Sequence, residues 1–590
     1  MLDPVWLKIL HAQLVNICEE MGLAMMRTSY SPIFSEGLDF CCLILDRHGE
    51  LVAMQNLNPA MMGQALYSGR WVIDDLGADS FEPGDVVVHN DPYRGGSHMP
   101  EHLLITPFFH RGELRGWLCN IAHVAEIGGM APGSFSANAT EVYQEGLRLP
   151  PVKLFRRGEP VQDVWRILLA NHRTPDHSWG DFNAIVGSLR VGLRRLEALY
   201  DEHGAAHIES SVPALFDYAE QWIRRDIAAL PDGTYSGEDC QEDDGFDERS
   251  YWLRVDLTIR GDQMVVDWSR TDPQARGTIN APYPVTASAT YTGIFQVIGG
   301  GAPINAGAIR PIDIVAPPGT VVNVRHPGAC VGGQTELQPR IVDLIQGRVL
   351  SQVAPERCSA ASGGTSGNFL FGGIHPRTGQ YYTHYHFEGN GWGGRAKSDG
   401  NDCQICPHGN CRNTPVEVFE TRYPWFTECY RLNVDAGGPG RTRGGLGITR
   451  LLHVEADEIV VSALCDRSKV APWGVHGGEE GDRLAYLVRT VGTDEFRTFS
   501  EAFGTPSDTK FSNVRLRRGD VVMLRSPSGG GYGPPWERAP ENVAGDVEEG
   551  YVTRECAAGQ YGVVVRQDGS VDPGGTFRAR TALRAGDGLG

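Results

Sequence analysis

Residues 90–129 read NDPYRGGSHMPEHLLITPFFHRGELRGWLCNIAHVAEIGG, two apolar runs joined by a polar segment that contains glycine. The runs at residues 102–109 and 117–122 have the composition of β-strands, and residues 110–116 have that of a hairpin loop. The stretch therefore predicts an antiparallel hairpin whose two outer ends meet at the same edge.

The register of this hairpin follows from the position of its turn. If the turn centres near Gly112 and Glu113, the numbers of paired residues sum to about 225. Position 101 then lies opposite 124, and position 98 lies opposite 127. Four polar side chains converge at this end of the hairpin, namely His98, Glu101, His123 and Glu126.

Two imidazoles and a carboxylate are a sufficient ligand set for one divalent cation, and either Zn or Mn suits them. We therefore expect a metal site at His98, Glu101 and His123. A His-x-x-Glu pair alone is a weak pattern, and the alternative is a group of polar residues at a strand end that are hydrogen-bonded or solvated. The convergence from both ends of the hairpin favours the metal.

Two further carboxylates lie near this stretch. Asp91, in a tight loop before Gly95 and Gly96, either approaches the metal as a hydrogen-bond acceptor or forms an ordinary Asx turn. Glu145 precedes a Pro-Pro turn, and we expect it to be solvated.

A group of thiols offers a second candidate site. Cys403, Cys406 and Cys411, with His408 nearby, resemble part of a structural zinc site. The pattern lacks a specified fourth ligand, so the alternative is free thiols in a turn.

Three glycine-rich stretches could cradle phosphate through backbone N–H groups, with Arg441 and Arg443 assisting. The alternative is glycine-rich turns. The stretches are residues 389–394, 435–447 and 528–533.

Some nucleotide-binding and hydrolase motifs are missing. No lysine follows a glycine, so the chain has no P-loop of the G-x-x-x-x-G-K-[ST] type. It also lacks a G-x-S-x-G nucleophile elbow and an H-E-x-x-H zinc motif.

Composition excludes several classes of protein. Among 590 residues, 53 Lys and Arg stand against 73 Asp and Glu, and the net charge of −20 repels nucleic acid and anionic membranes. No apolar run is long enough to span a membrane. The thirteen cysteines, in a chain without a signal peptide, fit reduced thiols in the cytoplasm.

Periodicity predicts an α+β fold, with a helical and mixed N-terminal lobe followed by strand-rich, glycine-rich middle and C-terminal lobes. Apolar stripes predict helices, and alternation after them predicts a strand at 251–259 that turns back at 264–268. The expected helices cover residues 4–27, 182–203 and 215–227. The expected domains are 1–232 with the metal-site hairpin, 233–455, and a mainly β 456–590.

The chain resembles the hydantoinase B/5-oxoprolinase family, which includes the large metal-carrying subunits of acetone and acetophenone carboxylases. The similarity covers nearly the whole chain in ordered segments. These are EEMGLAMMRTSYSPIFSEGLDF (19–40), NDPYRGGSHMPE (90–101), AHVAEIGGMAPGS (122–134), QEGLRLPPVKL (144–154), DWSRTDPQARGTINAP (267–282), NTPVEVFETRYP (413–424), DAGGPGRTRGGLG (435–447) and SGGGYGPPWERAPENVAGDVEEGYVT (528–553), followed by YGVVV.

The resemblance implies a metal site at His98, Glu101 and His123. The family usually has Asp where this chain has Glu101 and Glu126, so the side chains here are one methylene longer. It also implies a hetero-oligomer in which a hydantoinase A-like partner of actin/hexokinase-type fold binds ATP and Mg and phosphorylates the substrate.

The leading hypothesis is an ATP-dependent amidohydrolase that opens cyclic amides, with Glu126 or Asp91 transferring protons. One alternative is an ATP-dependent ketone carboxylase. Another is a metal-free scaffold subunit whose partner does all the chemistry.

Overall fold

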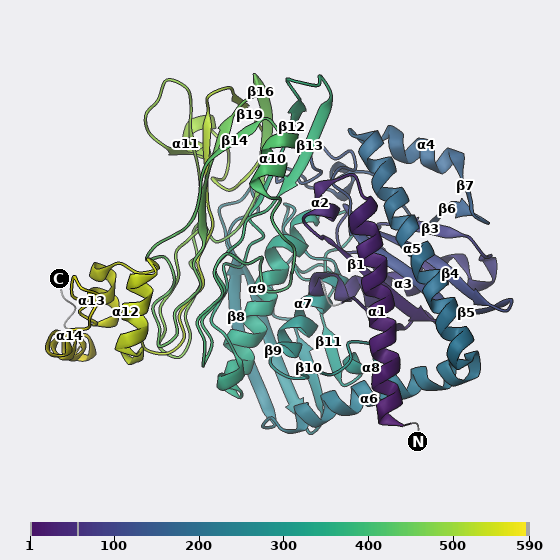
Figure 1. Cartoon of the computed structure of the whole chain (residues 1–590), viewed down its shortest axis with the longest axis horizontal. Helices are drawn as coiled ribbons and strands as arrows, with labels where there is room; N and C mark the ends of the chain where they lie inside the picture. Colours follow the sequence, from purple (N-terminus) through teal and green to yellow (C-terminus); the bar gives the residue numbers. More distant parts are fainter. Residues whose placement is uncertain (1–2, 56–57, 586–590) are drawn as a thin grey trace.

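The computed structural model describes residues 3–55 and 58–585. Helices and sheets are mixed along the chain, and the expected α+β class is confirmed. Figure 1 shows the N-terminal region on one side of an elongated molecule and the C-terminal helices on the other. Within the described residues, no helix is both long and apolar enough to cross a membrane.

The first sheet has seven strands in the order β2-β1-β5-β4-β3-β6-β7. The hairpin predicted from residues 90–129 is its centre. The strands are β1 Phe40–Asp46, β2 Leu51–Met54, β3 Val86–His89, β4 Glu101–His110, β5 Glu113–His123, β6 Val152–Arg156 and β7 Glu159–Pro160.

Both faces of this sheet are covered. Along β1, Cys41 and Leu43 belong to one apolar core, and the alternate residues Cys42 and Ile44 belong to another. This is the two-residue period of a strand buried on both sides. Helix α3 (Met62–Leu76) packs on the first face, and the long helices α1 (Pro4–Thr28) and α5 (Pro175–His203) pack on the second (Figure 1).

The three helices expected from apolar stripes are confirmed as α1, α5 and α6 (Ala205–Ala228). Asp3 caps α1 by accepting a hydrogen bond from the backbone N–H of Val5 at 2.9 Å. Gly204 ends α5 as its sequence position indicates.

The β4–β5 hairpin is confirmed, with a register one residue from the expected one. The turn is the dipeptide Arg111-Gly112, which has φ values of 52° and 84°, as a tight two-residue turn requires. The turn therefore lies one residue earlier than expected, and a bulge beside Phe108 shifts the register by one. As a result, Glu101 lies opposite His123.

The middle of the chain forms a four-stranded sheet in the order β11-β10-β9-β8. The strands at 251–260 and 263–267 confirm the alternation seen in the sequence. The elements are β8 Gly233–Gln241, β9 Tyr251–Arg260, β10 Gln263–Asp267, β11 Ile312–Val315, and the helices α7 Tyr283–Phe295, α8 Ala306–Ile309 and α9 Gln338–Asp343.

Two further sheets have the orders β13-β12-β16-β19 and β14-β15-β20-β17-β18. Strands from both sides of residue 455 pair in each sheet, so hydrogen bonds cross the boundary expected there, and the three-domain division stays a prediction. The strands are β12 Asn368–Ile374, β13 Tyr381–His386, β14 Trp425–Leu432, β15 Ile448–Val454, β16 Glu458–Leu464, β17 Ala485–Arg489, β18 Arg497–Thr498, β19 Lys510–Arg517 and β20 Val521–Arg525.

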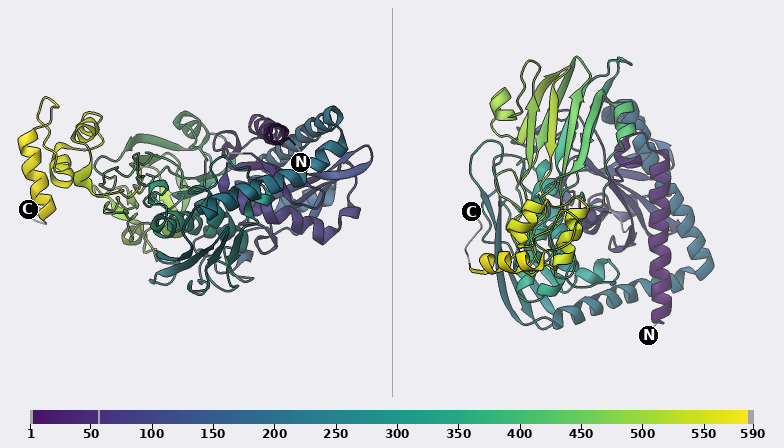
Figure 2. Two further views of the ribbon diagram at one scale, coloured as in Figure 1. Left: turned by 90° about the horizontal axis from the view of Figure 1, so that it is seen from below. Right: turned by 60° about the vertical axis from the view of Figure 1, so that its left-hand side comes forward.

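The chain ends in helices. Figure 2 shows them at the end of the molecule opposite the N-terminal helices. The stretch after residue 540 is therefore helical, whereas the sequence pattern indicated mainly β structure. The helices are α12 Pro540–Glu548, α13 Arg554–Tyr561 and α14 Pro573–Ala585, in addition to α4 Gln162–Ala170, α10 Val416–Arg422 and α11 Phe499–Phe503 earlier in the chain.

The three glycine-rich stretches pack against one another. A Cβ atom on Gly529 would lie 1.9 Å from the carbonyl oxygen of Trp392, and one on Gly391 would lie 1.8 Å from that of Gly445. The N–H of Gly529 donates to Gly445 at 2.9 Å, and that of Gly438 donates to Gly529 at 2.8 Å. Because these N–H groups are engaged, glycine serves close backbone packing here rather than a phosphate cradle.

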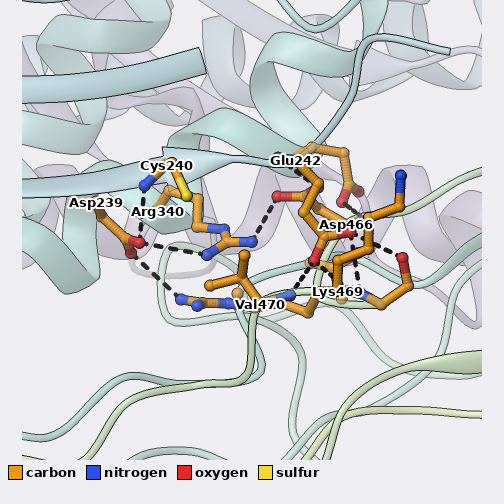
Figure 3. A network of polar contacts seen from close by, with 12 residues as sticks. Asp239, Cys240, Glu242, Arg340, Asp466, Lys469 and Val470 are labelled. Carbon is orange, nitrogen blue, oxygen red and sulfur yellow. Dashed lines mark hydrogen bonds and ion pairs between the residues drawn. The ribbon is translucent and has the colours of Figure 1, made fainter. Parts of the chain in front are cut away.

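A buried network of charges joins β8 to the loop after β16 (Figure 3). Arg340 on α9 contacts Asp466 at 2.5 Å and Asp239 at 3.6 Å, and Lys510 contacts Asp466 at 3.0 Å. Glu242 accepts hydrogen bonds from the backbone N–H groups of the same loop. Such a network fixes the geometry of its segments, because each buried charge requires its partner.

Candidate functional site

His98, Glu101 and His123 lie together at the end of the β4–β5 hairpin. Their ligand atoms all lie within 4.8 Å of one another, and each residue is 1% exposed. The ring centroids of the two histidines are 5.1 Å apart. We call these three residues the triad.

The backbone explains this convergence. Glu101 begins β4 and His123 ends β5, and the two residues are direct cross-strand partners. The carbonyl of His98 accepts a hydrogen bond from the N–H of Glu101 at 3.0 Å, which closes a tight turn and brings the His98 side chain back over the strand end.

The two imidazoles are in the state in which histidine binds metal. Burial lowers the pKa of His98 to about 3, and burial with the nearby histidines lowers that of His123 well below its usual value. Both rings are therefore neutral at neutral pH. The Nε2 atoms of both are buried and have no hydrogen-bond partner. Unpaired buried nitrogens are costly, so these residues fit a divalent cation.

The Glu101 carboxylate is held from two sides. Its oxygens accept hydrogen bonds from the Ser97 hydroxyl and, at 2.5 Å, from the Gln334 amide. Burial raises the pKa of Glu101, and the neighbouring Asp39 raises it further. A cation between these groups would favour their charged forms.

Asp39 is a fourth acidic group at the triad that the sequence pattern did not indicate. Its Oδ2 lies 3.8 Å from His123 Nδ1, and its Oδ1 accepts a hydrogen bond from Asn58 at 2.9 Å. The N–H of His123 donates to the Asp39 carbonyl, because β1 lies next to β5 in the sheet. Only the strand order brings this residue to the site.

The triad faces a cavity of about 30 Å³, close to the volume of one water molecule in the liquid. Tyr385 stacks on His123 with ring centroids 4.7 Å apart, and Phe135 packs edge-on to His98 at 5.5 Å. His408 and Cys411, from the loop expected to carry thiols, line the same cavity. The site is thus enclosed by segments from three regions of the chain.

The family profile of hydantoinase B/oxoprolinase matches residues 3–535. The chain belongs to the hydantoinase B/oxoprolinase family. The match agrees with the resemblance seen in the sequence.

Solved and curated relatives support this assignment. A candidate D-/L-hydantoinase component of the B type, from Pseudomonas sp. (strain NS671), is 32% identical over 97% of both chains. The crystal structure of ATP-dependent caprolactamase from Pseudomonas jessenii superposes with a TM-score of 0.89 at 29% identity, covering 99% of this chain and 100% of that one. Nucleotide-free acetone carboxylase shares the fold, with a TM-score of 0.89 at 20% identity over 99% of this chain and 83% of that one.

Glu126 and Asp91, the carboxylates expected to transfer protons, lie outside the residues that line the triad cavity. Glu126 pairs with Arg173 at 2.8 Å and accepts hydrogen bonds from the N–H groups of Gly128 and Gly133. Asp91 accepts a hydrogen bond from the N–H of Tyr93, the Asx-turn alternative. Their contacts are those of residues that shape loops.

Glu145 corrects the expectation of a solvated carboxylate. The residue is buried and accepts hydrogen bonds from the N–H groups of Cys330 and Val331 and from the Thr278 hydroxyl. Burial raises its pKa to about 7. Its partners come from more than 130 positions away in the chain, so local composition gave no signal.

The thiol group does not form a metal site of its own. Cys406 contacts His408 at 3.6 Å, whereas Cys403 contacts Tyr430 and Cys411 contacts Asn58. In the part of the chain that the structure describes, the triad alone gathers three or more potential ligands within 4.8 Å. Arg441 and Arg443, expected to assist phosphate, pair with carboxylates instead.

Proposed function

We propose that this chain is the metal-binding subunit of an ATP-dependent hydrolase that opens cyclic amides. The observation that carries the proposal is the triad: two buried, neutral imidazoles with unpaired Nε2 atoms beside a buried carboxylate. Membership of the hydantoinase B/oxoprolinase family supplies the reaction class. The ATP-dependent caprolactamase relative acts on a cyclic amide of this kind.

In this proposal His98, Glu101 and His123 hold one divalent cation, Zn or Mn, and Asp39 adds a second carboxylate beside it. The bound cation would supply Lewis acidity toward the amide carbonyl. Ser97 and Gln334 orient the Glu101 carboxylate.

The remaining residues position the site. Glu126 holds the turn that follows His123, and this turn leads to Phe135, which packs on both histidines. Asp91 caps the turn before His98. These contacts favour a positioning role for both carboxylates over the proton transfer expected from the sequence.

A partner subunit completes the enzyme. The chain has no P-loop lysine, so the proposal assigns ATP and Mg to a hydantoinase A-like subunit that phosphorylates the substrate. The thirteen cysteines are free thiols, which agrees with a reducing compartment, and we place the complex in the cytoplasm.

The test is an assay of this chain together with its partner subunit. Hydantoins, 5-oxoproline and simple lactams are compared with ketones plus bicarbonate, and ADP release is followed in each case. We expect ATP-dependent ring opening of at least one cyclic amide without bicarbonate. Turnover that depends on bicarbonate would assign the complex to the ketone carboxylases.

A further inference from the structure

A second cavity, of about 220 Å³, lies on the other side of the loop that closes the triad cavity. Pro407 lines this second cavity, whereas its neighbours His408 and Gly409 line the first. Gln296 in the second cavity donates a hydrogen bond to the Pro407 carbonyl at 2.7 Å. The two cavities therefore share one wall, which is a single strand of polypeptide.

Arg395 lines this cavity without a charged partner. Within the described residues, its guanidinium group makes no ion pair and no hydrogen bond, although it is partly buried. It rests on the ring of Trp392 with 5.6 Å between its Cζ atom and the ring centroid. Burial lowers the pKa of Arg395. A half-buried cation that lacks an anion is a place where a carboxylate gains charge-assisted hydrogen bonds.

Asp343 supplies the opposite polarity. The residue lines the same cavity, is 1% exposed, and its Oδ1 atom has no hydrogen-bond partner. Its Oδ2 atom accepts hydrogen bonds from the hydroxyl of Ser362 at 2.8 Å and from the N–H of that residue at 3.1 Å. One carboxylate oxygen is thus held in place while the other has no partner, which suits an ammonium group.

The volume limits what the cavity can hold. It equals about seven water molecules' share of liquid volume, enough for a short aliphatic chain and too small for a nucleotide. The Asp343 carboxylate also disfavours a phosphate dianion, because two like charges would meet in a confined space. The remaining class is a small molecule with one carboxylate and one ammonium group.

We propose that this cavity binds a short linear amino acid, its carboxylate on Arg395 and its ammonium group toward Asp343. The inference rests on the proposed function and names its substrate class as simple lactams. Opening a lactam breaks the C–N bond; the carbon takes oxygen from water to become a carboxylate, and the nitrogen takes protons to become an ammonium group. The product thus carries the two groups that the cavity complements.

Calorimetric titration of the full chain tests the proposal with three probes of equal length: δ-aminovalerate, valerate and pentylamine. We expect the amino acid to bind most tightly, valerate more weakly and pentylamine weakest. R395Q should weaken both carboxylates at least about tenfold, because a charge-assisted hydrogen bond is lost. D343N should weaken the amino acid while leaving valerate unchanged.

The matched control is R190Q. Arg190 lies over the ring of Phe155 at 5.9 Å, makes no ion pair in the described part of the chain and does not line the cavity. Its replacement should leave all three affinities unchanged. Absence of binding by the amino acid, or equal binding to wild type and R395Q, overturns the proposal. R395Q keeps the test valid if the buried D343N variant fails to fold.

The measurement is made with a chelator present and without ATP or the partner subunit. Probe binding therefore depends on neither the triad metal nor turnover. If cyclic amides are hydrolysed but no probe binds, only the second cavity's role is overturned. If δ-aminovalerate binds as expected but no cyclic amide is opened, the proposed function fails while the binding site stands.

Discussion

Glu101 and His123 face each other directly across the β4–β5 hairpin, at the ends of two neighbouring strands of a sheet that is buried on both faces. His98 joins them through the tight turn that precedes β4. A single hairpin therefore carries the whole triad, and the sheet holds it without help from a mobile loop. Side chains at this edge can be changed with little effect on the apolar cores on either side.

The charge of Glu101 should matter more than its length. E101Q keeps the size of the side chain but removes the anion beside two neutral imidazoles, so metal affinity should fall at least about 100-fold. E101D keeps the charge but withdraws it from Ser97 and Gln334, and it should retain metal with a smaller loss. Titration in metal buffers measures both. Equal losses in the two variants would contradict a role for the anion.

The stability of the metal-free protein should fall as pH rises, and Glu336 should contribute to this fall. Burial raises the pKa of Glu336 to about 8 from 4.5. Between these values the folded state keeps a proton that the unfolded state releases, so stability present at low pH is lost as pH approaches 8, by up to about 1.4 kcal/mol per pH unit.

The measurement is denaturant unfolding of wild type and E336Q from pH 5 to 8 with a chelator present. E336Q should show a shallower dependence, because the titrating group is gone. Parallel curves for the two proteins would show that Glu336 does not titrate in this range.

The buried charge network should be sensitive to the loss of one member. R340M leaves Asp466 and Asp239 without a partner in the interior and should cost about 3–5 kcal/mol of unfolding free energy. The control is R225M, which removes an exposed pair with Asp226 and should cost less than about 1 kcal/mol. Similar losses in both variants would mean that burial does not govern the network.

Close packing of the glycine stretches should forbid even one methyl group. G529A places a Cβ atom 1.9 Å from the Trp392 carbonyl oxygen and should destabilise by at least about 1–3 kcal/mol. G559A, in α13 with no atom within 4 Å of the added Cβ, should be neutral or stabilising by up to about 1 kcal/mol. Thermal unfolding measures the difference, and a G529A protein as stable as wild type would contradict the packing account.

Local patterns in the sequence predicted those parts of the fold that depend on neighbouring residues. The stripe of α1, the end of α5 at Gly204 and the β4–β5 hairpin follow from period, capping and composition. The hairpin also predicted the triad's convergence, because its residues are close in the sequence.

What the sequence could not predict depends on pairings between distant segments. Asp39 reaches the triad only because β1 lies beside β5, and Glu145 is buried by partners near residue 330. The glycine stretches interlock across more than 130 positions, so their composition alone looked like turns or anion cradles. No local period encodes the order of strands in a sheet.

The most direct test of the account is the metal content of the purified chain by elemental analysis, after growth in medium replete with Zn and Mn. We expect about one divalent ion per wild-type chain and almost none in H98A or H123A, with H172A as the control, a buried histidine that bonds Ser178 outside the triad. Circular dichroism should show the same fold in all four proteins. Equal metal content in wild type and both triad variants, or no metal in wild type, would contradict the account.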